Sequence, residues 1–295
     1  MIITIHRGSH EIGGTCIEMT SRGGTRILLD LGQPLPPLDE TISRPCPEPE
    51  LPAVKGLYRS DGDEKLVDGL LVSHAHQDHY GLMKNLHPEV PCYISEPTRR
   101  LIESTALFTG SGVHIEKHRT FCSGEAFNVG DFKISPFLVD HSAFDAHAFL
   151  IEDGVYKAFY SGDFRGHGRK SKLFEQFVAN PPAPVDVLLM EGTMLARAGE
   201  SCDSEQELEH KIVDAVGNNA QGLVLSSVSG QNIDRLVTLF RVAKRTKRVL
   251  VVDPYVAYIL DQLAAFNPSL PHLSIGFQKH LSVYYPQRLC HRINK

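Results

Sequence analysis

Four side chains that can bind a metal ion, His74, His76, Asp78 and His79, lie within six residues of the sequence. The apolar run Asp68–Val72 leads directly into them. A loop at the end of a strand can turn all four side chains towards one point. Imidazole and carboxylate groups suit zinc, whereas the sparse cysteines argue against iron–sulfur or copper–thiolate sites. The segment therefore predicts a metal site rather than a solvated loop that happens to be rich in histidine.

Two further candidate ligands follow later strands. His141 comes after the predicted strand Phe132–Asp140, and Asp163 comes after the predicted strand Lys157–Ser161. Either residue alone is a weak signal, but loops at one edge of a sheet meet in space. Two cations about 3.5–4 Å apart can share an ionised water and stabilise both oxygens of a phosphodiester displacement. Hydrolysis at such a site needs no serine or cysteine nucleophile.

The elements that must position these residues alternate between strands and helices, which indicates sheets flanked by helices. Strands are predicted at Ile2–His6, Thr15–Met19, Arg26–Asp30, Asp68–Val72, Phe132–Asp140, His147–Ile151, Lys157–Ser161 and Asp186–Met190. Helices are predicted at Gly81–Leu86, Pro97–Phe108 and Lys172–Ala179. The proline-rich stretch from about residue 32 to 62 is expected to be irregular, because proline breaks helices and central strands.

The sequence changes character after Thr193. Ser204 and Glu207 form a capping-box pattern at the start of a helix that runs to Val216. Strands and helices then alternate, as is typical of a parallel α/β unit. The order is Gly222–Ser227 (strand), Ile233–Ala243 (helix), Arg248–Val252 (strand) and Pro254–Phe266 (helix). We expect a boundary near 196–203, and therefore one domain over residues 1–198 and a second over 199–295.

In their order, the motifs resemble those of the metallo-β-lactamase superfamily. They are Leu28–Gly32, His74–His79, His141 and Asp163. The resemblance implies an α/β fold, an αββα sandwich with a two-zinc site at one edge of its sheets. It implies that His74, His76 and His141 hold the first zinc, that Asp78 and His79 hold the second, and that Asp163 bridges both. Asp30 is then expected to support the ligands from beneath.

The downstream half resembles the β-CASP group of that superfamily, which includes ribonuclease J and the messenger-RNA 3′-end-processing endonuclease. Leu188–Thr193 is similar to the first motif of this group, with Glu191 as its acidic residue. Gly13-Gly14, Gly162–Gly168 and Leu225–Asn232 also match, the last resembling the start of the inserted β-CASP domain. The resemblance implies catalytic roles for Asp78, Asp163 and Glu191.

One departure from the group concerns the second zinc. Members of the group return to the lactamase domain after the insertion, and that return supplies a final ligand. This chain is expected to end inside the insertion, so that its second metal site is one ligand short. Three later histidines, His272, His280 and His291, do not follow strand ends as such a ligand would.

Composition narrows the class of protein. The formal net charge of −5 argues against a broadly basic surface that coats nucleic acid, although a local basic groove is compatible with it. The six cysteines form no C-x-x-C pair, and we expect neither a secretory signal nor a membrane span, so the reducing cytoplasm is the expected compartment. We therefore predict a cytoplasmic zinc-dependent hydrolase that cleaves phosphodiesters of single-stranded RNA, as a monomer or a homo-oligomer.

Two alternatives remain open at this point. One is a small-molecule hydrolase, such as a thioesterase or lactonase, which shares the zinc motif. The other is a non-catalytic, metal-binding subunit of an RNA-processing complex, which the missing ligand would suit. It also stays open whether four residues after Asp163 contact substrate phosphates or form a solvated loop. They are Arg165, His167, Arg169 and Lys170.

Overall fold

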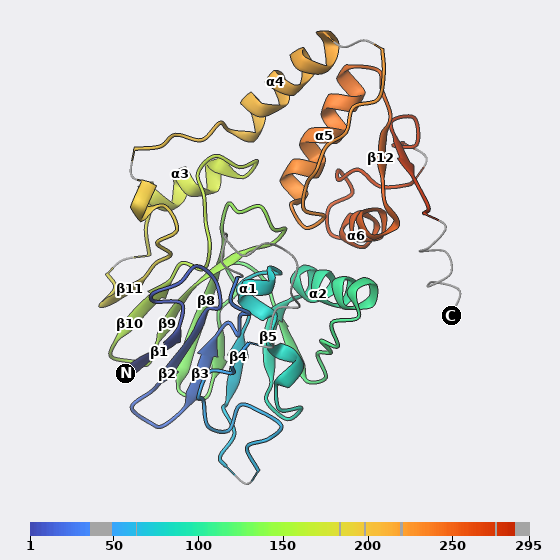
Figure 1. Ribbon diagram of the computed structural model, residues 1–295. Helices are drawn as coiled ribbons and strands as arrows, with labels where there is room; N and C mark the ends of the chain where they lie inside the picture. The colour runs from blue at the N-terminus through green and yellow to red at the C-terminus, as the bar shows by residue number, and fades with distance from the viewer. Residues whose placement is uncertain are drawn as a thin grey trace.

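The computed structural model describes residues 1–35, 49–62, 64–182, 184–197, 199–218, 221–274 and 276–286. Two sheets pack face to face, with helices over their outer faces (Figure 1). The first sheet has the order β1 (Ile2–Arg7), β2 (Cys16–Thr20), β3 (Arg26–Leu29), β4 (Gly69–Leu71), β5 (Cys92–Ser95) and β6 (His118–Phe121). The second has the order β11 (Val187–Leu189), β10 (Lys157–Tyr160), β9 (His147–Glu152), β8 (Phe132–Leu138) and β7 (Phe127–Val129). The expected αββα architecture is confirmed.

The central strands of the first sheet are apolar on both faces. Strand β4 is buried throughout and pairs in parallel with β3 and β5. Leu71 packs between the two sheets against residues such as Phe132 and Phe149 of the second sheet. Its neighbour Leu70 points the other way, into the core beneath the helices. A strand covered on both faces needs such a continuous apolar run, which explains why Asp68–Val72 shows no alternation.

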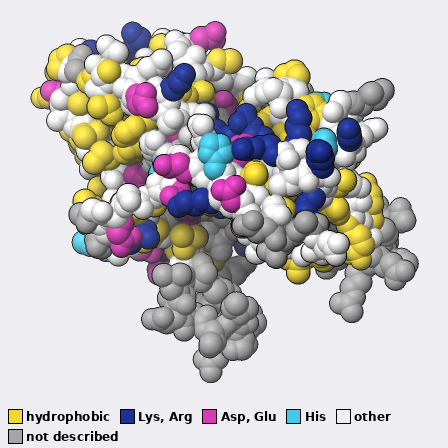
Figure 2. Space-filling view, turned by 90° about the horizontal axis from the view of Figure 1, so that it is seen from above, with side chains coloured by type: hydrophobic (Ala, Val, Ile, Leu, Met, Phe, Trp, Pro, Cys, Tyr) yellow, Lys and Arg dark blue, Asp and Glu magenta, His cyan; other side chains and the backbone are white. Residues whose placement is uncertain are grey.

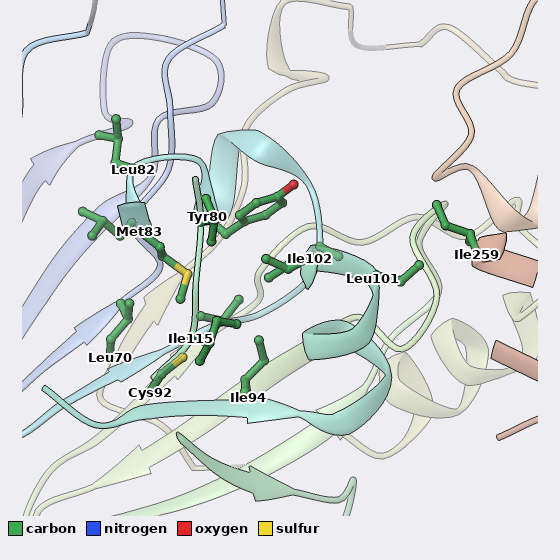
Figure 3. Packing of buried hydrophobic residues seen from close by; sticks show 14 of the residues in the cluster. Leu70, Tyr80, Leu82, Met83, Cys92, Ile94, Leu101, Ile102, Ile115 and Ile259 are labelled. Carbon is green, nitrogen blue, oxygen red and sulfur yellow. The ribbon is translucent and has the colours of Figure 1, made fainter. Parts of the chain in front are cut away.

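Helices complete the two outer layers. Over the first sheet lie α1 (Gln77–Tyr80), the 3₁₀ turn η1 (Met83–Asn85) and α2 (Glu96–Thr109). Figure 3 shows Tyr80 and Met83 from the short helices and Ile102 from α2 gathered around Leu70 and Ile94 of the sheet. Over the second sheet lies α3 (Ser171–Ala179), which packs through the aromatic ring of Phe177.

The C-terminal elements form a separate group above the sheets in Figure 1. They are α4 (Glu205–Asn218), α5 (Ile233–Arg245), β12 (Leu250–Val252), α6 (Pro254–Ala264) and β13 (Leu281–Val283), preceded by the 3₁₀ turn η2 (Leu195–Arg197). Strands β12 and β13 are parallel and α6 connects them, as an α/β unit requires. Ser204 and Glu207 exchange the two hydrogen bonds of a capping box. The division at residue 198 stays a prediction.

Two of the expected elements are wrong. No strand forms over Gly222–Ser227, where Leu223 and Leu225 are each 85% exposed. An apolar run becomes a strand only when another strand pairs with it, and within the described residues none pairs here. The helix expected at Gly81–Leu86 is only the turn η1, because the helical segment begins earlier, at Gln77. Strands β5, β6, β7 and β13 were not predicted. Among the described residues, no helix is both long enough and apolar enough to span a membrane.

Candidate metal centre

Five of the predicted site residues lie at one edge of the sandwich. Asp30 follows β3, and His74 lies three residues after the parallel strand β4. Strands β8 and β10 run in one direction, because both are antiparallel to β9, and β11 is parallel to β10. His141, Asp163 and Glu191 follow these three strands and therefore emerge together. The chain topology thus explains how residues far apart in sequence share one site.

Three imidazoles form the first donor group. His76 Nδ1 lies 3.2 Å from His74 Nε2 and 3.1 Å from His141 Nε2. Zinc–nitrogen bonds of about 2.0–2.1 Å in a tetrahedral shell place donor atoms about 3.3 Å apart. These three nitrogen atoms are therefore spaced as ligands of one ion would be.

A second donor group lies beside the first. His79 Nε2 is 3.3 Å from Asp163 Oδ1 and 3.9 Å from Asp78 Oδ2. The other oxygen of Asp163, Oδ2, is 3.9 Å from His74 Nε2 and 4.0 Å from His141 Nε2. One carboxylate oxygen of Asp163 thus faces each donor group, which is the placement that a bridging ligand needs.

Burial sets the protonation of the two groups differently. Burial, reinforced by neighbouring imidazoles, holds the pKa of His74 and His141 well below its usual value and lowers the pKa of His76 to about 4. The first group is therefore neutral at pH 7, as metal ligands must be. Burial opposes the charged form of His79 as well, but Asp30 and Asp163 outweigh it and raise its pKa well above the usual value. In return, the hydrogen bond and charge of His79 outweigh burial and lower the pKa of Asp163 to about 2.

Asp30 organises the floor of the centre. Its carboxylate accepts hydrogen bonds from Ser73 N and Ser73 Oγ at 2.7 Å each, and from Tyr160 Oη at 2.6 Å. His79 Nδ1 also donates to it at 2.7 Å, which turns Nε2 of His79 towards Asp163 and the second donor group. Because the Ser73 hydroxyl hydrogen points to Asp30, His74 Nδ1 donates to Ser73 Oγ at 3.0 Å, and Nε2 of His74 carries the free lone pair. Sequence reasoning missed Ser73 and Tyr160, although both adjoin the predicted motifs.

The loops near the N-terminus hold α1 in place. Thr15 N donates to Asp78 O at 3.1 Å, and Leu31 N donates to His79 O at 2.9 Å. A side chain at Gly32 would overlap the carbonyl oxygen of Asp78, so only glycine allows this close approach. The backbone of the two candidate ligands Asp78 and His79 is therefore fixed by segments that come earlier in the chain.

Glu191 lies next to Asp163. Its Oε1 accepts a hydrogen bond from Phe164 N at 2.8 Å, and its own N–H donates to Ser161 Oγ at 3.1 Å. Burial, together with the nearby charge of Asp163, raises the pKa of Glu191. A cleft of about 660 Å³ is lined by Asp78, His79, Asp163 and Glu191 together with residues of Arg7–Gly13. Substrate can reach the donor groups from this side.

Comparison with known proteins identifies the family. A family model described as "Beta-lactamase superfamily domain" matches residues 49–220, more than half of the chain. The chain belongs to this superfamily. Ribonuclease J of Sinorhizobium meliloti is 25% identical over 73% of this chain and 40% of its own length. Transcription termination factor FttA of Methanothermobacter thermautotrophicus is 25% identical over 90% of this chain and 41% of its own length.

These relatives are β-CASP proteins, so the resemblance to that group is confirmed. The chain spans only about two fifths of the length of either relative. A solved structure of a protein of unknown function from Enterococcus faecalis V583 has the same fold, with a TM-score of 0.75 and 21% identity. It aligns with 97% of this chain and 74% of its own.

The lactamase fold implies a divalent-metal site, and the donor groups fit that requirement. Within the described residues, the groups that could hold an ion are His74 with His76 and His141, and His74 with His79 and Asp163. The neutral imidazoles of the first donor group are the donors that such an ion needs. His79, which Asp30 orients and keeps protonated, would join them by giving up its Nε2 proton when an ion binds. The superfamily's metal chemistry is therefore compatible with the residues present.

Other predicted residues lie away from the centre. His272 makes hydrogen bonds with Leu270 O and Ser274 Oγ, and His280 makes one with Arg248 O. Neither belongs to the donor groups, and His291 lies outside the described residues. Arg165, Arg169 and Lys170 form neither a solvated loop nor a free phosphate site, because they pair with carboxylates of α4 and α5.

Proposed function

We propose that this chain carries the active site of a zinc-dependent hydrolase that cleaves RNA phosphodiester bonds. The observation that carries the proposal is the pair of donor groups joined by Asp163, with Glu191 and an open cleft beside them. The choice of RNA is supported by relatives that include a ribonuclease J. We place the metal-binding domain at residues 1–198 and the β-CASP-like unit at 199–295.

Each donor group would hold one zinc ion. His74, His76 and His141 would bind the first, Asp78 and His79 would bind the second, and Asp163 would contact both. Bound zinc would polarise the phosphate and supply an activated water as the nucleophile. The first ion should bind more tightly, because three neutral imidazoles and a water complete a catalytic zinc shell.

The remaining residues orient these ligands and move protons. Asp30 holds His79 with Nδ1 bound and Nε2 facing the centre, so the ring need not reorient when an ion enters. Glu191, whose pKa is raised by burial, is suited to give a proton to the leaving oxygen. Its hydrogen bond from Phe164 N fixes the carboxyl group beside the bridging aspartate.

The proposal is tested with labelled single-stranded RNA, single-stranded DNA and a panel of thioesters and lactones. We expect the protein to cleave RNA, to lose this activity in a chelator, and to regain it when zinc is added back. Turnover of thioesters or lactones without cleavage of either nucleic acid would contradict the proposal and favour a small-molecule hydrolase. Tight zinc binding with no turnover of any substrate would instead favour a metal-binding subunit.

A further inference from the structure

A second cluster of buried charges lies next to the metal centre. It occupies the contact between the loop Phe164–Lys170, which follows Asp163, and the first turns of α4 and α5. Viewed from the side of these helices, Lys and Arg side chains lie interspersed with acidic ones (Figure 2). The metal chemistry proposed above uses none of these charged residues.

Asp234, in the first turn of α5, is the hub of this cluster. Its carboxylate accepts hydrogen bonds from Arg165 Nη2 at 2.5 Å and from Arg169 N at 3.0 Å. Lys170 Nζ lies 3.7 Å from the same carboxylate. Asp234 is buried, so its ionised carboxylate depends on these donors and on the helix N-terminus that it occupies. Contacts from three residues of one loop thus converge on a single side chain of α5.

The same loop is tied to the segment that carries His141. Asp140 accepts hydrogen bonds from Gly168 N at 2.7 Å and from Lys170 N at 3.2 Å. A side chain at Gly168 would collide with the Asp140 carboxylate, so the loop must approach this closely. Lys170 Nζ donates to His141 O at 3.1 Å.

Helices α4 and α5 complete the connection through their backbones. Ile233 N, at the start of α5, donates to Ser142 O at 3.1 Å, and Glu205 N, at the start of α4, donates to His167 O at 2.9 Å. The segment that carries His141 and the loop that follows Asp163 therefore both contact the start of α5, and the loop also contacts the start of α4.

We propose that Asp234 is a positioning residue that fixes the loop after Asp163, and through it the relative placement of Asp163 and His141. This inference rests on the proposed zinc site. Asp234 touches neither donor group, so its effect on zinc passes through Arg165 and the loop backbone. Loss of an outer partner of metal ligands typically weakens metal binding by about 10–100-fold. Because Asp234 does not contact the donor groups directly, we expect Asp234→Asn to weaken zinc binding by the low end of that range, about tenfold.

The decisive variant is Arg165→Gln, because two explanations of the role of Asp234 predict opposite changes in zinc affinity. If Asp234 acted only through its charge, removal of the Arg165 cation would strengthen binding of zinc. If the Asp234–Arg165 contact positions the loop, Arg165→Gln weakens binding as Asp234→Asn does. Zinc affinity is measured by competition with a chromophoric chelator, and Co²⁺ absorption spectra report the ligand geometry. In the double variant the two losses should not add, since both remove one contact.

A matched control is Glu205→Gln. Glu205 pairs with Arg235 of α5 but contacts the loop only through its backbone N–H. This variant should lower the melting temperature and leave the zinc affinity and the Co²⁺ spectrum unchanged. Unchanged zinc binding in Asp234→Asn, or tighter binding in Arg165→Gln, would overturn the inference. If the wild-type protein binds no zinc, the proposed function fails first, so the two failures are distinguishable.

Discussion

The metal centre and the charge cluster at α5 are both buried and polar, but they are organised in opposite ways. At α5, carboxylates are matched by cations: Glu205 pairs with Arg235, Glu209 with Arg169 and Asp234 with Arg165. At the metal centre, donor nitrogens of three imidazoles face one another at 3.1–3.2 Å. Two of those rings have a pKa well below the usual value, so they do not supply charge to each other.

This difference distinguishes a structural cluster from a binding site. Buried charged groups are stable when they find partners within the chain, as the three carboxylates of the α5 cluster do. A set of converging lone pairs is completed only by a cation from outside. Removing a residue from the first kind of cluster should therefore cost stability, whereas removing one from the second kind should cost ligand binding and activity.

The largest effect is expected when the first donor group is destroyed. His74→Ala/His76→Ala removes two of three imidazoles, so zinc content should fall and RNA cleavage should drop by at least about 1000-fold. Elemental analysis of the tag-free protein and a turnover assay measure both. His272→Ala/His280→Ala is the matched control, because these rings lie outside the donor groups. Full zinc occupancy in the first double variant would rule out this ligand assignment.

A smaller effect should separate proton transfer from metal binding. Glu191→Gln keeps the shape of the side chain but cannot exchange a proton, so turnover should fall by about 100-fold. Zinc content should not change, because Glu191 lies outside both donor groups. Glu11→Gln, a change to another carboxylate that lines the same cleft, should retain activity. If Glu191→Gln instead lost zinc, the residue would belong with the ligands.

Substitution of Asp30, which lies beneath the donor groups, should have a still smaller effect on the metal centre. Asp30→Asn takes away the carboxylate that orients His79, and zinc affinity should weaken by about tenfold. The pKa of His79, which Asp30 helps to raise, should fall, because burial then dominates. Nuclear magnetic resonance titration of the metal-free protein tests this directly. An unchanged titration of His79 would show that Asp163 alone holds its proton.

The contrast between the two clusters also shows which parts of the site could be predicted from the sequence. The residues of the donor groups were identified because four of them are nearly contiguous and the others follow predicted strands. Tyr160 was missed as a partner of Asp30, since the two are 130 residues apart and meet only where the sheets stack. The hydrophobic periodicity of one segment does not predict which strand of the other sheet will pack against it.

Arg165 shows the same limit for charges. From the sequence it belongs to a basic run after Asp163, and its exposed or phosphate-binding roles were equally plausible. Its partner Asp234 lies 69 residues further on, in a helix whose own polar residues look solvated. Similarly, the apolar pattern of Gly222–Ser227 predicted a strand, but pairing depends on a neighbour that the pattern does not specify. The sequence predicts the chemistry of neighbouring residues, but it does not predict which distant residues pair with one another.

The smallest effect is expected at Glu205, and it concerns stability alone. Burial opposes ionisation of Glu205, but hydrogen bonds from Arg235 and Thr238 outweigh it and hold its pKa below the usual value. A carboxylate with a lowered pKa stabilises the fold above its unfolded pKa, and this contribution is lost as pH falls through the folded pKa. Glu205→Gln should therefore reduce the free energy of unfolding at pH 7 by about 1.5–3 kcal/mol, the range for hydrogen bonds to a charged group.

The pH dependence provides the sharper form of this test. The amide that replaces the Glu205 carboxylate has no proton to gain, so the gap between wild type and variant should narrow as the pH falls below about 4.3, the usual value for glutamate. Denaturant unfolding of both proteins, with a chelator present to remove the contribution of metal, measures the gap from pH 7 to 3. Zinc affinity at pH 7 should be the same in both proteins. A gap that is constant with pH would mean that the carboxylate charge of Glu205 contributes nothing, and the α5 cluster could then not be described as a set of mutually satisfied ion pairs.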